Sequence, residues 1–273
     1  MAYSSDPAET GRTARGFLPP QNEEERRLMR RVEELCTLAQ RRGIPRYTGF
    51  LSDREQSLAE AAANRAQVTC IRFWGGFEDA ERRVLCIEPE DAWQEEPVAC
   101  LRLRAHLAPG AEPPAHRDIL GAVLGLGLER TCLGDIRPDP DHPGDCYLFL
   151  LQDKLDFVSA NLTAAGHVRL DAAPCDQPPQ SALREPERQL RQATVSSLRA
   201  DSVLAAMLHT SRGQAAQVIS EGRVQVNHVP LRSAHDAVYA GDIFTVRGSG
   251  RYRLQEIGGK SRSDRTFILF YQY

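Results

Sequence analysis

The stretch that decides the fold of the C-terminal part covers residues 194–253: TVSSLRADSVLAAMLHTSRGQAAQVISEGRVQVNHVPLRSAHDAVYAGDIFTVRGSGRYR. It reads as two short helices followed by a small sheet. Asp201 is placed to cap the first helix, and Ser211 with Gln214 forms a capping box, so a second helix begins at Arg212. Gly222 then ends the second helix, because glycine readily adopts the left-handed conformation that closes many helices.

Alternating residues after this glycine predict the strands of the sheet. Residues 223–226 alternate polar and apolar side chains, and the turn-prone pair Asn227-His228 closes that strand. Residues 243–246 form a further strand after Gly241-Asp242. The glycines of residues 248–250 then allow a tight return into another strand.

Arginines in this stretch stand where helix ends and strand starts expose backbone groups. Arg199 precedes the first helix, Arg212 begins the second and Arg223 follows it. A helix N-terminus beside a guanidinium is a good phosphate site, because the amide dipoles and the planar fork of donors act together. The residue types alone leave open that these are ordinary solvated surface arginines.

Composition indicates a globular chain with an uneven charge distribution. The chain has 273 residues, of which 41% are hydrophobic and 26% charged, enough for two or three domains. Its net charge is −3, yet residues 194–273 hold ten Lys/Arg against six Asp/Glu, whereas residues 66–173 hold ten against eighteen. This distribution argues against a non-specific polyanion binder and allows one basic face.

The cysteine pattern and the hydropathy of the sequence indicate the cellular compartment in which the protein works. The seven cysteines include no CxxC pair, which favours reduced thiols over a zinc site or a disulfide framework. No apolar run approaches the length of a membrane span, and residues 1–15 lack the core of a signal peptide. We therefore expect a cytoplasmic protein that does not contact membranes.

Changes of periodicity divide the chain into segments. Asn22 precedes an amphipathic helix, and Ser52 with Glu55 opens a second helix. After residue 66 the strands outnumber the helices, which predicts an α+β domain with one antiparallel-rich sheet and helices on one face. The predicted segments are a disordered leader (1–21), a helical lobe (22–65), the α+β domain (66–172), a Pro-rich linker (173–193) and the basic module (194–273).

Two motifs resemble those of enzymes, but the residues and predicted elements around them do not fit. His116-Arg117-Asp118 spells the kinase catalytic triplet, but valine occupies the expected asparagine position and no glycine-rich loop precedes it, which favours helix capping. Gly125-Leu126-Gly127 follows a helix, whereas a nucleotide-binding turn follows a strand. We therefore expect no catalytic residue, no metal and no cofactor.

An aromatic segment, Phe73-Trp74-Gly75-Gly76-Phe77, joins two predicted strands. An exposed aromatic side chain on a sheet edge can stack on a nucleic-acid base. The alternative is that the rings fill the core. We expect a core position for one of Phe73 and Trp74 and leave the other open.

The C-terminal stretch resembles the S4-type RNA-binding domain of many pseudouridine synthases and bacterial tyrosyl-tRNA synthetases. The resemblance implies that Arg199, Arg212 and Arg223 lie on one face and contact RNA, with Arg54 and Lys260 outside that face as controls. The residues that carry it are Leu198-Arg199-Ala200-Asp201, Ser211-Arg212, Ala215-Ala216, Val218-Ile219, Glu221-Gly222-Arg223-Val224, Val226-Asn227 and Gly241-Asp242-Ile243. The candidate RNA-binding residues are Arg199, Ser211, Arg212, Gln214, Arg223, Asn227, Arg247, Arg251 and Arg253.

From about residue 24 onward the chain also resembles the YlmH-type proteins of bacteria and plastids. The segments that carry this resemblance are Phe50-Leu51-Ser52-Asp53-Arg54-Glu55, Trp74-Gly75-Gly76-Phe77-Glu78-Asp79-Ala80-Glu81-Arg82, His116-Arg117-Asp118-Ile119-Leu120-Gly121-Ala122-Val123-Leu124-Gly125-Leu126-Gly127, Gly134-Asp135-Ile136 and Arg247-Gly248-Ser249-Gly250-Arg251-Tyr252. It implies an α+β protein with a helical N-terminal lobe, a central RRM-like domain and a C-terminal S4-type domain. It further implies a monomeric, non-catalytic factor that binds rRNA and peptidyl-tRNA on the large ribosomal subunit, in ribosome-associated quality control of stalled translation. An RNA-modifying enzyme (pseudouridine synthase or methyltransferase type) and a cell-division scaffold are the alternatives.

Overall fold

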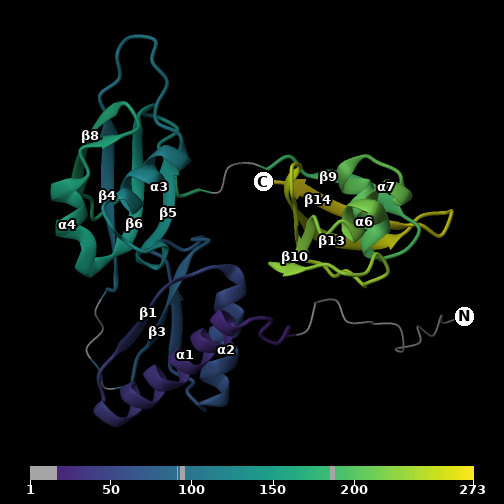
Figure 1. Ribbon diagram of the computed structural model, residues 1–273, viewed down its shortest axis with the longest axis horizontal. Coiled ribbons are helices and arrows are strands. Elements are labelled where there is room, and N and C mark those ends of the chain that lie inside the picture. The colour runs from purple at the N-terminus through teal and green to yellow at the C-terminus, as the bar shows by residue number, and fades with distance from the viewer. Residues whose placement is uncertain (1–16, 91, 93–95, 185–187) are drawn as a thin grey trace, which may run out of the picture. The chain divides into compact units, whose positions relative to one another are not determined.

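The computed structural model describes residues 17–90, 92, 96–184 and 188–273, which form two compact units (Figure 1). The N-terminal unit comprises residues 19–185 and the C-terminal unit residues 186–273. Most of the predicted disordered leader lies outside the described residues. Within the described ranges, no helix has the length and apolar character that crossing a bilayer requires.

Two helices and a three-stranded antiparallel sheet begin the N-terminal unit. The Asn22 side chain caps α1 (Glu23–Arg42) by accepting the Glu25 N–H, and the predicted capping box begins α2 (Asp53–Arg65). The sheet has the strand order β1 (Arg46–Leu51), β3 (Arg83–Ile87) and β2 (Ile71–Trp74). Both helices pack on this sheet through one apolar core.

The sequence predicted only helices for residues 22–65, and the structure differs there. Strand β1 lies between the two helices and pairs with β3, so β2 and β3 share one core with α1 and α2. Val84 and Cys86 of β3 also belong to a second apolar cluster with Phe149 of the following domain. Gly49 interrupts the alternation of β1, which hid the strand. A Cβ at Gly49 would lie 2.8 Å from the Thr131 carbonyl oxygen, so a long-range contact explains the glycine.

A second antiparallel sheet follows, with two helices on one face. Its strand order is β5 (Leu133–Pro138), β6 (Asp145–Leu151), β4 (Val98–Ala105), β8 (Val168–Pro174) and β7 (Ala164–Ala165). The helices α3 (His116–Gly125) and α4 (Leu155–Asn161) cover the core face, and the short helices η1 (Arg130–Cys132) and η2 (Gln152–Lys154) precede β5 and α4. The chain order β4-α3-β5-β6-α4-β8, with β4 and β6 at the centre, is the arrangement of an RRM domain. The predicted RRM-like fold is therefore present, and β5, β6, β4 and β8 are called the RRM-like sheet.

Residues 75–82 join the two sheets of the N-terminal unit. A Cβ at Gly76 would lie 2.3 Å from the Phe149 ring, and the Phe77 ring packs against that ring at a tilt of 44°, with 4.9 Å between the centroids. The Asp135 carboxylate in β5 accepts the backbone N–H groups of Glu81 (2.8 Å) and Arg82 (3.1 Å). Close packing and internal hydrogen bonds thus explain these motif residues.

The C-terminal unit is a six-stranded sheet with two helices on one face (Figure 1). Its chain order is β9 (Arg191–Val195), α6 (Ala200–Leu208), α7 (Arg212–Ser220), β10 (Val224–Val226), β11 (Val229–Pro230), β12 (Ile243–Val246), β13 (Gly250–Lys260) and β14 (Thr266–Gln272). The capping box of α7 is confirmed. Asn227 and His228 have φ values of 49° and 64°, which makes them the tight turn between β10 and β11.

One helix start in this unit differs from its prediction. The N-cap of α6 is Arg199, and Asp201 lies in the first turn instead of at the cap. The Asp201 carboxylate accepts hydrogen bonds from two arginines and from the Ser202 N–H. One of these partners, Arg212, lies eleven residues away at the start of the next helix, and a local capping rule does not include that contact.

Secondary structure also occupies much of the predicted linker. Strand β8 extends to Pro174, the short helix α5 (Gln180–Leu183) follows, and β9 begins at Arg191. The Arg137 side chain holds α5 in place, because its Nε donates to the Ala182 carbonyl oxygen at 3.1 Å and its Nη2 donates to the Arg184 carbonyl oxygen. Residues 175–184 therefore form a strap on the N-terminal unit.

Candidate nucleic-acid interface

A helix-start cluster in the C-terminal unit is built around Asp201. This side chain is 8% exposed, and its carboxylate accepts hydrogen bonds from Arg199 Nη2 at 3.1 Å and Arg212 Nη2 at 2.8 Å. The two arginine side chains are 37% and 48% exposed, and Arg199 also contacts His235. One buried carboxylate thus holds two half-exposed guanidiniums together at the starts of α6 and α7.

The charge of this cluster suits an anionic ligand. Burial acts to raise the pKa of Asp201, but the hydrogen bonds from Arg212 and Arg199 outweigh it, so the pKa lies below its ordinary value. The carboxylate is therefore charged at neutral pH, and two arginines leave a net positive charge. Each guanidinium has five N–H donors and uses one or two on Asp201, and holding the side chains in place reduces the entropy lost on binding.

Ser211 and Gln214 cap the N-terminus of α7. The Ser211 hydroxyl oxygen accepts the Gln214 N–H at 3.2 Å, and the Gln214 side chain accepts the Ser211 N–H at 3.1 Å. This reciprocal pair fixes the first turn that carries Arg212. Both residues lie beside the cluster, and their hydrogen bonds order it.

Arg223 lies at the opposite end of α7. Its Nη2 donates to the Arg247 carbonyl oxygen at 3.0 Å and its Nη1 donates to Glu221 at 3.3 Å, while the Arg247 N–H donates to the Arg223 carbonyl oxygen at 3.0 Å. A nine-residue helix, about 13 Å long, separates this pair from Arg212. The structure therefore brings Arg199 and Arg212 together and places Arg223 with Arg247.

Arg251 and Arg253 form a third group, on the other face of the sheet. They alternate in β13 with core residues that pack under the helices, so they face away from α6 and α7. The Arg251 guanidinium lies 4.6 Å from the centre of the Tyr273 ring, and Arg188 lies 4.1 Å from Tyr273 and 4.8 Å from Tyr271. Burial raises the pKa of Tyr273 to about 12. The sequence missed Arg188, Tyr271 and Tyr273, although the alternation of the final strand could have placed both tyrosines on this face.

Asn227, the last predicted site residue, is engaged within the fold. Its Nδ2 donates to Asp242 at 2.8 Å and its Oδ1 accepts the Ile243 N–H at 2.9 Å. Both polar atoms of the amide therefore fasten the turn after β10 to the start of β12.

The aromatic side chains of the RRM-like sheet are covered by the chain itself. RRM domains stack bases on aromatic residues of the sheet face opposite the helices. On that face of β6 stand Tyr147 and Phe149, which are 3% and 1% exposed. Phe77 and Ala182 of the strap share their apolar cluster. In this conformation these rings therefore do not present a base-stacking surface.

The two aromatic residues before Phe77 are also packed into the fold. Phe73 is half-buried against the core of the first sheet, and Trp74 is half-buried against the cluster that contains Phe77. The Arg72 guanidinium lies 5.7 Å from the centre of the Trp74 ring. Neither ring is fully exposed for stacking on a base.

The remaining motif and thiols have structural explanations. The Asp118 carboxylate accepts the Ala115 N–H at 3.0 Å, so His116-Arg117-Asp118 forms the start of α3, as its polar pattern predicted. Burial raises the pKa of Cys86 and of Cys146 to about 12, which keeps both thiols protonated and weakly nucleophilic at neutral pH. Across the described ranges, no group of His, Cys, Asp and Glu side chains is arranged to hold a metal ion.

Comparisons with known proteins assign both units. Residues 198–244 match the family described as "S4 domain", a range that includes the helix-start cluster and ends before Arg247. Residues 114–177 match the family described as "Putative RNA-binding domain in YlmH". Among solved structures, "Cell division protein ylmH from Streptococcus pneumoniae" is 20% identical, and the match covers 59% of this chain and 96% of that chain with a TM-score of 0.46.

A curated relative covers nearly the whole chain. Ribosome-associated protein quality control protein P2 of Bacillus subtilis is 32% identical over 250 residues, which span 90% of this chain and 95% of the relative. The chain therefore belongs to the YlmH family of S4-domain proteins.

Proposed function

We propose that this protein binds RNA of the large ribosomal subunit, namely rRNA together with peptidyl-tRNA, in ribosome-associated quality control of stalled translation. The observation that carries the proposal is the helix-start cluster, in which Asp201 holds Arg199 and Arg212 at the edge of an S4 domain. The printed name of the B. subtilis relative supports the quality-control context.

The arginines act as phosphate ligands in this proposal. Arg199 and Arg212 contact one stretch of RNA backbone beside the N-terminus of α7, and Arg223 with Arg247 contacts a further phosphate at the other end of the helix. Arg251 and Arg253 contact RNA from the opposite sheet face. Planar guanidiniums suit phosphate oxygens because they donate two parallel hydrogen bonds.

The protein acts by binding alone in this proposal, as a cytoplasmic monomer without a cofactor. The buried thiols and the capping role of Asp118 support this view, since they remove two candidate sources of catalytic groups. Calorimetric titration with S-adenosylmethionine is expected to give no saturable heat. A site of micromolar affinity would favour an RNA-modifying enzyme.

The test is Arg212→Ala combined with Arg223→Ala. Asp201 keeps Arg199 as a partner, so the fold is expected to survive. Each lost phosphate contact makes the plot of log affinity against log salt shallower by about 0.7 to 0.9, so the double variant should lose roughly one to two units of slope. Co-sedimentation with large subunits across a salt series measures this.

The control is Lys260→Ala, because Lys260 lies in the same unit and its side chain is 66% exposed. Arg54, the other control that the sequence suggested, is unsuitable because it is 6% exposed and bonded to Glu25 at 2.8 Å. A folded double variant that sediments like the wild type at every salt concentration contradicts the proposed contact.

A further inference from the structure

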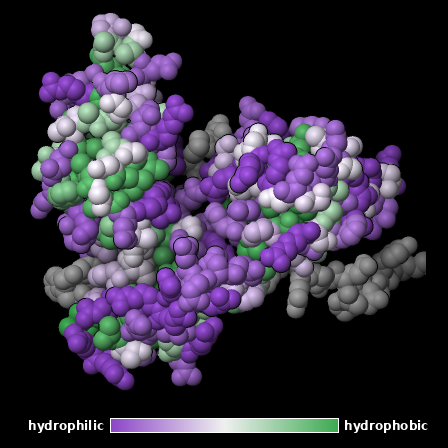
Figure 2. Space-filling model, in the orientation of Figure 1, coloured by the Kyte–Doolittle hydropathy of each residue, from purple (hydrophilic) through white to green (hydrophobic). Residues whose placement is uncertain are grey.

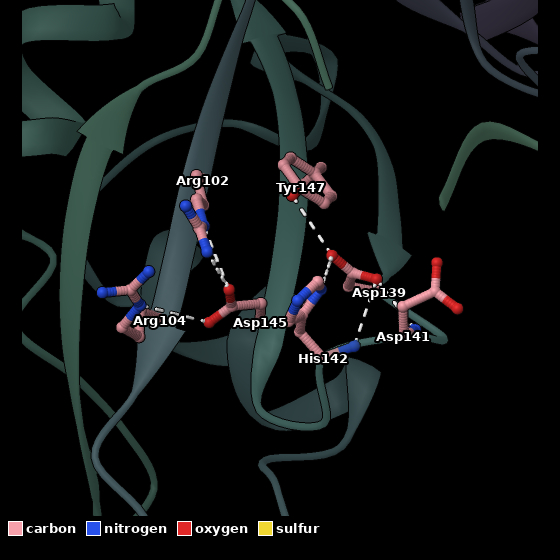
Figure 3. Close-up of polar contacts among 7 residues, drawn as sticks. All are labelled: Arg102, Arg104, Asp139, Asp141, His142, Asp145 and Tyr147. Carbon is pink, nitrogen blue, oxygen red and sulfur yellow. Dashed lines mark hydrogen bonds and ion pairs between the residues drawn. The ribbon is translucent and has the colours of Figure 1, made fainter. Parts of the chain in front are cut away.

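The RRM-like sheet carries a second pair of arginines held by one buried aspartate (Figure 3). The Asp145 side chain is 8% exposed, Arg102 Nε donates to its Oδ2 at 3.0 Å, and Arg104 Nε lies 3.5 Å from its Oδ1. The two arginine side chains are 37% and 58% exposed. The cluster therefore matches the one around Asp201 in residue types and in burial.

These side chains lie on the sheet face that points away from α3 and α4. Leu101 and Leu103 of β4 belong to the core under those helices, so Arg102 and Arg104 face the other way. The strand register places Arg104 between Asp145 of β6 and Asp171 of β8. The pair thus lies at the centre of the RRM-like sheet, where RNA crosses an RRM domain.

Only half of this face is open to a ligand. Over β6, the Tyr147 ring is buried, and Figure 3 shows its hydroxyl directed at Asp139, to which it donates at 3.3 Å. Over β8, Arg169 and Asp171 are exposed, as is Arg104 beside them in β4. A ligand on the open half therefore meets charged side chains rather than aromatic rings.

The open half is positively charged within an acidic domain. Its charged residues are Arg102, Arg104, Arg169, Asp145 and Asp171, three cations against two anions. Asp145 is buried beneath its arginines, and His106 holds Asp171 at 2.7 Å. Asp171 is itself 70% exposed, so the open half presents guanidiniums together with one exposed carboxylate, in a segment where acidic residues outnumber basic ones by eighteen to ten.

We propose that Arg102, Arg104 and Arg169 form a second RNA-binding site, which holds phosphates of the RNA backbone without stacking on bases. The inference rests on the proposed RNA-binding function and extends it to the N-terminal unit. Guanidiniums held flat on a sheet bind phosphate oxygens in a bidentate manner. Because the aromatic positions are buried, this contact is independent of RNA sequence.

The test uses the full chain and unfractionated tRNA over a salt series. Arg104→Gln removes the most exposed cation of the cluster and leaves Arg102 to neutralise Asp145, so the fold is retained. We expect the salt slope to become shallower by about 0.7 to 0.9, the contribution of one phosphate. Asp171→Asn removes an exposed negative charge from the same face, so affinity should rise about two- to five-fold at low salt.

The matched control is Arg65→Gln on α2, in the same unit. Arg65 is 63% exposed and bonded to Glu33 at 3.1 Å, so this change also removes one arginine from a surface ion pair. It should leave both affinity and salt slope unchanged. A cooperative unfolding transition near that of the wild type, followed by tryptophan fluorescence, confirms that the three variants are folded.

Two results would overturn the inference. One is that Arg104→Gln and Asp171→Asn both bind tRNA like Arg65→Gln. The other is that Arg104→Gln weakens binding but leaves the salt slope unchanged, because a lost phosphate contact must make that slope shallower. Neither result bears on the proposed RNA contact of the S4 domain, which the Arg212 and Arg223 variants test. If those variants show no effect, the Arg104 and Asp171 variants still test the site on the RRM-like sheet.

Discussion

The two arginine–aspartate clusters, one in each unit, place the same side chains in different backbone settings. Around Asp201 the arginines stand at the starts of two helices, where aligned peptide dipoles add positive potential. Around Asp145 they stand in the middle of β4, whose peptide groups pair with β6 and β8. In the proposed binding mode, the cluster at the helix starts is therefore expected to be the stronger anion site, because the backbone contributes there. We therefore expect the Asp201 cluster to dominate RNA affinity.

The largest expected effect comes from removing both arginines of one cluster. Arg199→Gln with Arg212→Gln leaves a buried carboxylate without a cation, which should lower the unfolding free energy of the C-terminal unit by about 3 kcal/mol. Hydrogen exchange of the α6 and α7 amides measures this loss. Adding Asp201→Asn should restore most of the stability. A double variant that exchanges like the wild type would show that the carboxylate is not held by charge.

The same double change around Asp145 should act on the other unit. Arg102→Gln with Arg104→Gln is expected to cost about 2 to 3 kcal/mol, slightly less because the Arg104 contact is longer. Residues 186–273 contain no tryptophan, and Trp74 of β2 belongs to the N-terminal unit, so tryptophan fluorescence follows this unit during urea unfolding. Unchanged fluorescence midpoints would show that the Asp145 carboxylate does not need its arginines, in contrast to the expectation for Asp201.

Lowering the pH should change the stability of the two units in opposite directions, through Asp201 in one unit and Asp135 in the other. The pKa of Asp201 is lower in the folded chain, so its contribution is complete above the unfolded value of about 3.9 and is lost as the pH falls through the folded value. Burial raises the pKa of Asp135, whose contribution is instead present at low pH and lost as the pH rises. The stability difference between wild type and Asp201→Asn should therefore shrink between pH 6 and pH 3. For Asp135→Asn it should change in the opposite direction, and urea midpoints at both pH values decide the matter.

The smallest effect is expected from single arginine changes. Arg104→Gln and Arg212→Gln each leave the aspartate one cationic partner, so each should lower the unfolding free energy by less than about 1 kcal/mol. RNA affinity should fall more for Arg212→Gln, because of the helix start beside it. Equal losses of affinity would mean that the backbone setting contributes little.

Local signals in the sequence led to accurate element boundaries. Ser211 with Gln214, Ser52 with Glu55 and the Asn227-His228 turn each act within a few residues, and all three appear as predicted. The order of strands and helices likewise predicted an antiparallel sheet with helices on one face, and the family resemblance added its RRM-like arrangement. These features depend on neighbours in the chain, which a sequence displays directly.

Contacts between distant segments account for what was missed. Strand β1 was hidden because Gly49 makes room for Thr131, and Asp201 was taken for a cap because its partner Arg212 lies on the next helix. Likewise, Asp145 meets Arg104 only through the register of β6 with β4. Such pairings follow from the completed fold rather than from local pattern.

The strap at the end of the N-terminal unit has a mechanical consequence. Residues 185–187 follow it directly, so tension along the chain between the units acts first on α5. The load would fall on the two Arg137 hydrogen bonds and peel the strap from its end, one contact at a time. Behind it, β8 is paired with β4 over several residues and would resist as a unit. The strap is therefore a weak link that yields at low force and leaves the RRM-like sheet intact.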